Sequence, residues 1–281
     1  MQTAPPILFD RSRLRKRAAR AESSFAQHDF LWHEAAARAE ESLSFIARDF
    51  PRILAFGAHA FTPPQGSTLI HAAFAPPGMA PHVMVDEECL PFAPDSFDAV
   101  LCLLNLQWVN DVPGALAQFY RALKPDGLFI AMVLGGETLR ELRSSFAATE
   151  SARSGGVSPR VSPFMDVRDG GALLQRAGFA LPVADSELLD VSYPNVFALM
   201  DDIRGCGQSN MLQQQAQHFT PRGFFMDAAK HYAEAYGDAE SRIPATVEFI
   251  TLTGWKPAAN QQQPAKRGSG KLSLKDVLSP H

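Results

Sequence analysis

Two acidic residues and one amide follow consecutive strand-like segments of the sequence. Asp86 and Glu87 are the first two residues after the apolar run 83–85, and Asn105 follows the run 99–104. Because the carboxyl ends of parallel strands meet at one edge of a sheet, we expect these side chains to line one crevice. A carboxylate there can accept hydrogen bonds from a ribose hydroxyl or an exocyclic amine. The alternative is that Asp86 and Glu87 only end a strand at the surface.

A second group of charged residues lies further along the chain. It consists of Glu137, Arg140, Arg160, Asp166 and Arg168. These residues are candidates for contacts with a substrate above the sheet, or for an ion-pair lattice that fixes the loop 153–168. The nearby serines lack the strand-turn-helix setting of a nucleophile, so no catalytic residue is identified.

The histidines and cysteines form no metal-binding pattern. The eight histidines are scattered, and Cys89, Cys102 and Cys206 lie far apart with no Cys-x-x-Cys pair. We therefore expect neither a protein-held metal nor a disulfide, which favours a reducing compartment.

Periodicity predicts the elements that must position these groups. Short apolar runs typical of buried strands occur at 53–56, 69–70, 83–85, 99–104 and 128–134. A helical pattern at 111–123 separates the last two, with Asn110 or Asp111 as its cap and a turn at 124–127 before the strand. A strand, a helix and a strand in this order indicate a right-handed crossover in a parallel sheet.

The flanking segments predict further helices and two more strands. Helical patterns cover 30–50, 169–177, 196–204 and 222–236, and strand patterns cover 183–191 and 246–255. The expected organisation is an N-terminal helical segment at 1–50, an α/β domain at 51–256 with a helical insertion at about 194–242, and a flexible tail at 257–281. The short apolar segment 271–278 in that tail is a candidate docking element.

Four motifs in order give the chain a family resemblance. They are Asp-Glu-Glu-Cys-Leu-Pro-Phe at 86–92, Asp-Ser-Phe-Asp-Ala-Val at 95–100, Leu-Gln-Trp-Val-Asn-Asp at 106–111 and Arg-Ala-Leu-Lys-Pro-Asp-Gly-Leu-Phe-Ile at 121–130. This stretch resembles the second half of a class I S-adenosylmethionine-dependent methyltransferase core. The resemblance implies a doubly wound, mostly parallel α/β sheet and S-adenosylmethionine as cofactor. The residues expected to bind it are Gly57, Asp86, Glu87 and Asn105.

The flanks resemble one branch of that superfamily. They are Leu-Phe-Asp-Arg at 8–11, Gly-Gly-Glu-Thr-Leu-Arg-Glu-Leu at 135–142, Gly-Gly-Val-Ser-Pro-Arg-Val-Ser-Pro-Phe at 155–164 and Arg-Ile-Pro-Ala-Thr at 242–246. They are similar to bacterial relatives of a respiratory complex I assembly factor described as a protein-arginine hydroxylase. That branch implies a protein substrate and a role in complex I assembly.

The first two strands depart from the family pattern. Gly57 matches the first glycine of the cofactor turn, but Ala55 replaces the usual acid, and Phe74 or a neighbour stands where a second acid would bind ribose. Two strand-helix-strand units need on the order of 50 residues, whereas 52–86 offers 35. At least one crossover helix should therefore be shortened or missing. The alternative function is a catalytically inactive pseudo-methyltransferase that acts as an assembly or scaffold protein.

Composition narrows the class and the partners. The 281 residues are 46% hydrophobic and 20% charged, as in a globular protein, and 26 basic against 30 acidic residues give a net charge of −4. We therefore expect no nucleic-acid partner. Six basic residues within 11–20 form either a solvated helical face or a contact for a phosphate or an acidic partner. The longest apolar run is far shorter than the roughly 20 residues of a membrane-spanning helix, so we expect no transmembrane segment and a cytoplasmic protein.

Overall fold

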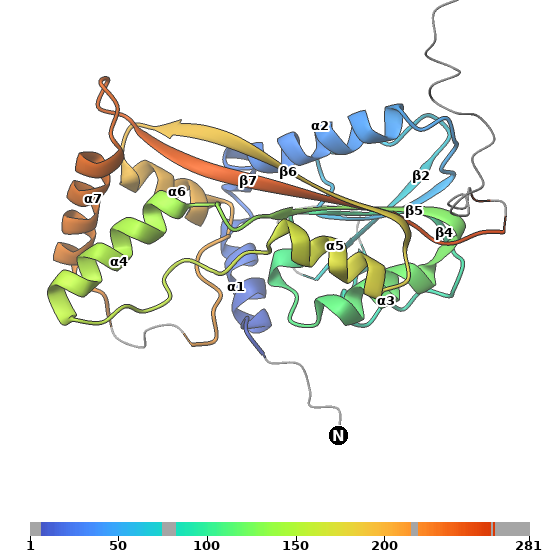
Figure 1. Cartoon of the computed structure of the whole chain (residues 1–281), viewed down its shortest axis with the longest axis horizontal. Coiled ribbons are helices and arrows are strands. Elements are labelled where there is room, and N and C mark those ends of the chain that lie inside the picture. Colours follow the sequence, from blue (N-terminus) through green and yellow to red (C-terminus); the bar gives the residue numbers. More distant parts are fainter. Residues whose placement is uncertain (1–6, 75–82, 215–218, 260, 262–281) are drawn as a thin grey trace, which may run out of the picture.

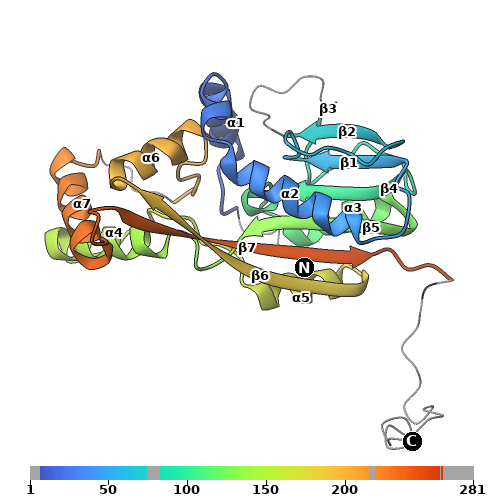
Figure 2. The ribbon, with the colours of Figure 1, turned by 90° about the horizontal axis from the view of Figure 1, so that it is seen from above.

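The computed structural model describes residues 7–74, 83–214, 219–259 and 261. Its centre is one seven-stranded sheet with the order β3-β2-β1-β4-β5-β7-β6, seen from above in Figure 2. The strands are β1 (Arg52–Phe56), β2 (Thr68–Ala73), β3 (Val83–Met84), β4 (Phe97–Leu103), β5 (Leu123–Leu134), β6 (Ala180–Tyr193) and β7 (Ile243–Trp255). The first five strands pair in parallel, and β7 runs antiparallel between β5 and β6. The predicted doubly wound, mostly parallel sheet is confirmed.

Helices cover both faces of the sheet, as Figure 1 shows. The helix α2 (Phe30–Ser44) packs on one face, and α3 (Val112–Ala122) with α5 (Val167–Arg176) packs on the other. Alternation along β4 explains this, because Leu101 and Leu103 pack with α2 while Val100 and Cys102 pack with α3. Strands β1, β4 and β5 are mostly buried and read as continuous apolar runs, as the sequence predicted. The prediction of a buried strand at 83–85 was wrong for Val83 and Met84, which form the exposed edge strand β3.

The turn predicted at 124–127 lies inside β5 rather than before it. Phe97 pairs with Leu123, and the ladder then skips to Ala99 and Leu128. The four intervening residues bulge out of the ladder, with Asp126 at φ 64°. The prediction of a turn was right and the predicted start of the strand was wrong. The predicted cap of α3 is Asp111, whose carboxylate accepts from the Gly114 N–H at 2.9 Å.

The connection between β1 and β2 contains no helix. Residues 57–67 form turns and irregular chain, all within the described part of the structure. The predicted loss of a crossover helix is therefore confirmed at this position. The stretch 75–82, most of the predicted tail and its segment 271–278 lie outside the described residues.

A helical unit surrounds the ends of β6 and β7 that project past the rest of the sheet (Figure 1). It contains α4 (Arg140–Ser154), α6 (Val196–Gly205) and α7 (Arg222–Tyr236). Phe146, Leu199, Phe224 and Tyr232 form its core together with residues of β7. Tyr232 is fully buried and its hydroxyl donates to the Pro244 carbonyl at 2.6 Å, which fixes α7 to the start of β7.

The basic N-terminal segment folds as α1 (Arg11–Ala21), with Asp10 as its cap. It is only partly a solvated face, because Arg13 and Arg17 donate to the carbonyls of Leu212 and Asn210 at 2.8 and 2.6 Å.

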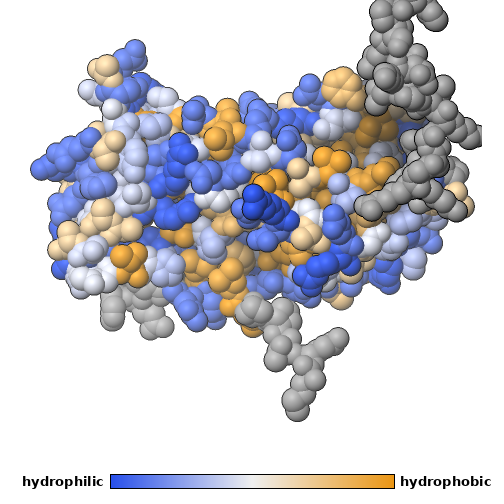
Figure 3. Space-filling model, viewed as in Figure 1, coloured by the Kyte–Doolittle hydropathy of each residue, from blue (hydrophilic) through white to orange (hydrophobic). Residues whose placement is uncertain are grey.

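No helix in the described part of the chain is long and apolar enough to cross a bilayer. Figure 3 shows hydrophilic residues over much of the face above α4 and α7, with hydrophobic residues gathered toward the middle and the opposite end.

Candidate functional site

The carboxyl ends of β1, β2 and β4 surround a small cavity. Gly57, Glu87 and Asn105 line it, as predicted for a cofactor site, together with Phe74 from the end of β2. Its free volume is about 70 Å³. The fourth predicted residue, Asp86, lies beside Glu87 with a carboxylate that is 43% exposed.

Gly57 is required by the packing of the sheet. Its φ is 64°, in the left-handed region that favours glycine, and a Cβ there would lie 1.9 Å from the Leu103 carbonyl oxygen. The nearest side-chain atom is Trp32 Nε1, which would lie 3.6 Å from that Cβ. From the sequence, this glycine was expected to make room for a cofactor. The structure gives a reason within the chain itself, namely the approach of two neighbouring strands.

Three consecutive carboxylates hold the guanidinium of Arg11. Its Nη2 lies 2.5 Å from Glu87 Oε2 and 3.3 Å from Asp86 Oδ1, and its Nη1 lies 3.5 Å from Glu88 Oε1. The same guanidinium lies 3.7 Å from the centre of the Phe74 ring, a cation–π arrangement. Burial raises the pKa of Glu87, and the charge of Arg11 opposes that rise.

The polar side chains of this cavity suit an adenosine ligand, but its volume is too small for one. Carboxylates at the end of β3 and an amide at the end of β4 are suitable partners for ribose hydroxyls and an exocyclic amine. Small-molecule sites, however, are usually about 300–1,000 Å³, well above this cavity. Leu14 and Ala18 of α1 form one of its walls. The side chains therefore suit such a ligand, while the free volume between α1 and the strand ends is smaller than it needs.

A second, largely apolar cavity of about 80 Å³ adjoins the first and shares Trp32, Leu104 and Trp108 with it. Asp202 lines it and accepts from the Tyr193 hydroxyl at 2.7 Å, while His28 Nδ1 lies 2.5 Å from its other oxygen. Burial and the neighbouring Asp202 raise the pKa of Tyr193. This polar group was not predictable from the sequence, because His28 and Asp202 are 174 residues apart and no local pattern connects them.

A third cavity of about 320 Å³ lies next to the second and is rich in guanidinium groups. Arg17, Arg160 and Arg204 line it, and Gln208 lines all three cavities. Burial and the neighbouring cations Arg13 and Arg20 lower the pKa of Arg17, which is consistent with local positive charge. The cavities form a row from the sheet edge to the helical unit, and the last of them suits an anionic group.

The five predicted substrate residues do not gather in one place. Glu137 and Arg140 form an exposed pair at 3.0 Å, and Arg140 also reaches Glu141. Asp166 caps α5 by accepting from the Arg168 N–H at 2.8 Å, and the Arg168 side chain is exposed.

Arg160 is the member of that group that lines a cavity, and it also takes part in an ion-pair lattice. It lies 2.8 Å from Glu150 Oε1 and 4.2 Å from the centre of the Phe224 ring. Glu150 also accepts from the Ser158 N–H and hydroxyl, both at 2.7 Å. Arg160 therefore fixes the loop after α4 through Glu150, whereas the other four residues named in the lattice alternative lie outside this cluster.

The Gly-Gly-Glu motif after β5 has a structural role. A Cβ at Gly135 would lie 2.4 Å from the Glu248 carboxylate, and that carboxylate accepts from the Glu137 N–H at 2.8 Å. Gly135 therefore leaves room for a buried acid that ties β5 to β7. In the described ranges, no three His, Cys, Asp or Glu side chains are placed to hold a metal ion.

Comparisons with known proteins agree with this geometry. Residues 68–131 match the family model described as a methyltransferase domain. The chain is 37% identical to the arginine-hydroxylase NDUFAF5, mitochondrial, of Danio rerio, over 96% of the chain and 89% of that protein. It is 30% identical to a malonyl-[acyl-carrier protein] O-methyltransferase of Xylella fastidiosa, over 90% of each. The solved YcgJ protein of Bacillus subtilis shares the fold, with a TM-score of 0.53 and 17% identity over 80% of this chain and 99% of that one.

Proposed function

Because the chain belongs to the family of the mitochondrial arginine-hydroxylase NDUFAF5, we propose that it modifies an arginine side chain of a protein substrate and does so in respiratory complex I assembly. The observation that carries the proposal is the similarity over 96% of the chain, which includes the sheet, the cavity at its edge and the helical unit. The methyltransferase fold makes S-adenosylmethionine the proposed cofactor, with Gly57, Glu87, Asn105 and the neighbouring Asp86 as its site.

The chain's own residues would bind and orient the cofactor rather than react. Glu87 and Asp86 offer acceptors for hydroxyl groups, and Asn105 offers both a donor and an acceptor at the end of β4. When bound, S-adenosylmethionine supplies an electrophilic methyl group on a sulfonium. Methyl transfer would depend mainly on positioning, which explains why the sequence shows no obligatory catalytic residue. Hydroxylation would instead insert one oxygen atom of dioxygen into the arginine side chain, and an external two-electron donor would reduce the other oxygen atom to water.

The test is mass spectrometry of respiratory complex I from cells with and without this protein. A complex I arginine that loses the mass of one oxygen atom in its absence would support hydroxylation, and one that loses the mass of a methylene group would support methyl transfer. Complementation with Asp86→Ala is the matched variant, and it should restore the modification poorly. Unchanged arginine masses throughout the complex would refute an arginine-modifying enzyme.

The second candidate is a non-catalytic assembly protein. The small cavity and Phe74 in place of a ribose-binding acid favour it. This candidate predicts that complex I levels fall without the protein, that Asp86→Ala restores them, and that no arginine changes in mass. We further propose a cytoplasmic location, because the three free cysteines are typical of a reducing compartment.

A further inference from the structure

We propose that α1 is an internal plug of the cofactor site, in which the Arg11 guanidinium occupies the acceptors that the cofactor would use. This inference rests on the proposed cofactor. Its consequence is that S-adenosylmethionine binds only when α1 leaves the sheet edge.

Arg11 pairs with the carboxylates that would accept hydrogen bonds from the cofactor. One side chain bonds to Asp86, Glu87 and Glu88, which are the successive carboxylates at the end of β3. It also covers the face of Phe74, which ends β2 and lines the same cavity. Arg11 is 15% exposed and Glu87 is 1% exposed, so the Glu87 carboxylate is closed to a ligand, while Asp86 stays 43% exposed.

The helix α1 also forms one wall of the cavity. Leu14 and Ala18 lie one and two turns after Arg11 on the same face of α1, and both line the cavity. Moving α1 away would therefore remove one wall and the occupying charge together. The present volume of about 70 Å³ is well below the usual size of a ligand site, so a bound cofactor would need the space that Leu14 and Ala18 now fill.

The remaining contacts of α1 indicate a helix that can detach. Its fully buried residues are the small Ala18 and Ala21, so the larger apolar contact that its release breaks is that of Leu14, which packs partly buried against Phe9, Trp108, Met211 and Leu212. Arg13 and Arg17 hold it by hydrogen bonds to backbone carbonyls of the 210–212 segment, which water can replace. Arg11 also has a buried Nε without a hydrogen-bond partner among the described atoms, so the closed state is not fully satisfied.

The same movement would alter the third cavity. Arg17 lines that cavity, one turn and a half beyond Arg11 on α1. Detachment of α1 would withdraw its charge and open the arginine-lined space at the same time. Cofactor entry and access to this second space would thus be coupled through one helix.

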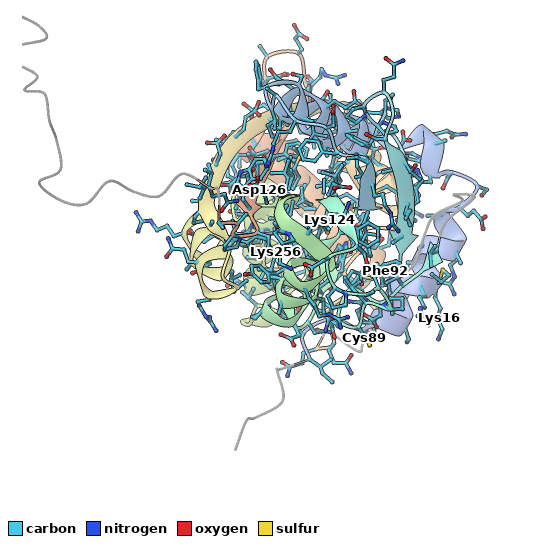
Figure 4. All side chains as sticks on the ribbon, turned by 90° about the vertical axis from the view of Figure 1, so that its right-hand side faces the viewer. Lys16, Cys89, Phe92, Lys124, Asp126 and Lys256 are labelled. Carbon is cyan, nitrogen blue, oxygen red and sulfur yellow. The ribbon has the colours of Figure 1, made fainter. Side chains whose placement is uncertain are left out.

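The test compares S-adenosylhomocysteine binding by full-length wild type, Arg11→Gln and the control Lys16→Gln, measured by calorimetry. Lys16 lies on the same helix, and Figure 4 shows it at the periphery of the molecule. If the closed state outnumbers the open one by about ten to one, Arg11→Gln should bind about tenfold more tightly than wild type, and Lys16→Gln should match wild type. Hydrogen exchange of residues 11–21 should become faster when ligand is added to wild type.

The outcomes separate the plug from the cofactor proposal. Equal affinity of all three proteins, or ligand that slows exchange in α1, would refute the plug and leave the cofactor proposal standing. No heat from any variant at millimolar ligand would refute the cofactor and the plug with it.

A cross-link tests the plug without removing Arg11. Phe9 and Leu212 face each other in an isolated antiparallel bridge flanked by backbone hydrogen bonds. Facing residues of this kind have Cα atoms about 4.5 Å apart, within the range that a disulfide spans. In a Phe9→Cys/Leu212→Cys protein the oxidised form should bind ligand at least about tenfold more weakly than the reduced form. Equal binding by both forms would contradict the proposal.

Discussion

Replacing Gly57 by alanine should destabilise the protein through two separable costs. Gly57 has a φ of 64°, and a left-handed conformation costs a residue with a Cβ about 1–2 kcal/mol. The new methyl group would also lie 1.9 Å from the Leu103 carbonyl oxygen. Leu103 is fully buried and paired with Met132, so its backbone cannot easily retreat. Forced overpacking of this kind costs about 1–3 kcal/mol.

Gly66 provides the matched control for this prediction. Its φ is 85°, yet no heavy atom lies within 4 Å of the position that a Cβ would take there. Gly66→Ala should therefore lose only the conformational cost of about 1–2 kcal/mol. Gly57→Ala should lose about 2–5 kcal/mol in total, and the difference between the two variants measures the approach of Leu103.

The assay is urea unfolding followed by tryptophan fluorescence, with Trp32 close to the altered position. Equal losses of unfolding free energy in the two variants would refute the argument that the Leu103 carbonyl dictates this glycine. A Gly57→Ala protein as stable as the Gly66→Ala protein that nevertheless fails to bind S-adenosylhomocysteine would assign the glycine to the cofactor instead.

Three further predictions follow from the site. Burial raises the pKa of Glu87 above its ordinary 4.5 against the opposing charge of Arg11, so the folded state binds more protons than the unfolded state and stability falls as pH rises from 4.5 through the raised pKa. Glu87→Gln removes the titrating group and should flatten this fall in a urea series across pH, and an unchanged fall would contradict the assignment to Glu87. Gly135→Ala should cost about 1–3 kcal/mol by displacing the Glu248 carboxylate, seen as a lower urea midpoint, and an unchanged midpoint would show that the carboxylate moves freely. Maleimide should label Cys89, the exposed thiol at the edge of the view in Figure 4, and spare the two buried cysteines of the native protein, as read by mass spectrometry; rapid labelling of more than one thiol would contradict the burial.

Much of the fold was predictable because its signals are local. Apolar runs mark β4 and β5, and Asp111 caps α3 at the position the sequence indicates. Counting residues between the first strands was enough to predict a lost crossover helix. The extent of β5 was not predictable in this way, because the bulge at 124–127 depends on pairing of Leu123 with Phe97 across the sheet.

The candidate site was predictable only where it follows the strand ends. Gly57, Glu87 and Asn105 meet because parallel strands end together. The pairing of Arg11 with Asp86 spans 75 residues, and no local pattern connects them. Long charged side chains can pair with many partners at similar cost, so such contacts depend on tertiary structure.

The place of β7 in the sheet has a consequence for synthesis of the protein. β7 is the last strand in the described part of the chain, yet it lies between β5 and β6 and pairs with both. As the chain leaves the ribosome, β5 and β6 each have an unpaired edge until residues 243–255 emerge. Open strand edges invite pairing with other chains. A nascent chain stalled before Ile243 should therefore recruit chaperones, and a C-terminal truncation that removes β7 should aggregate rather than leave a smaller folded domain.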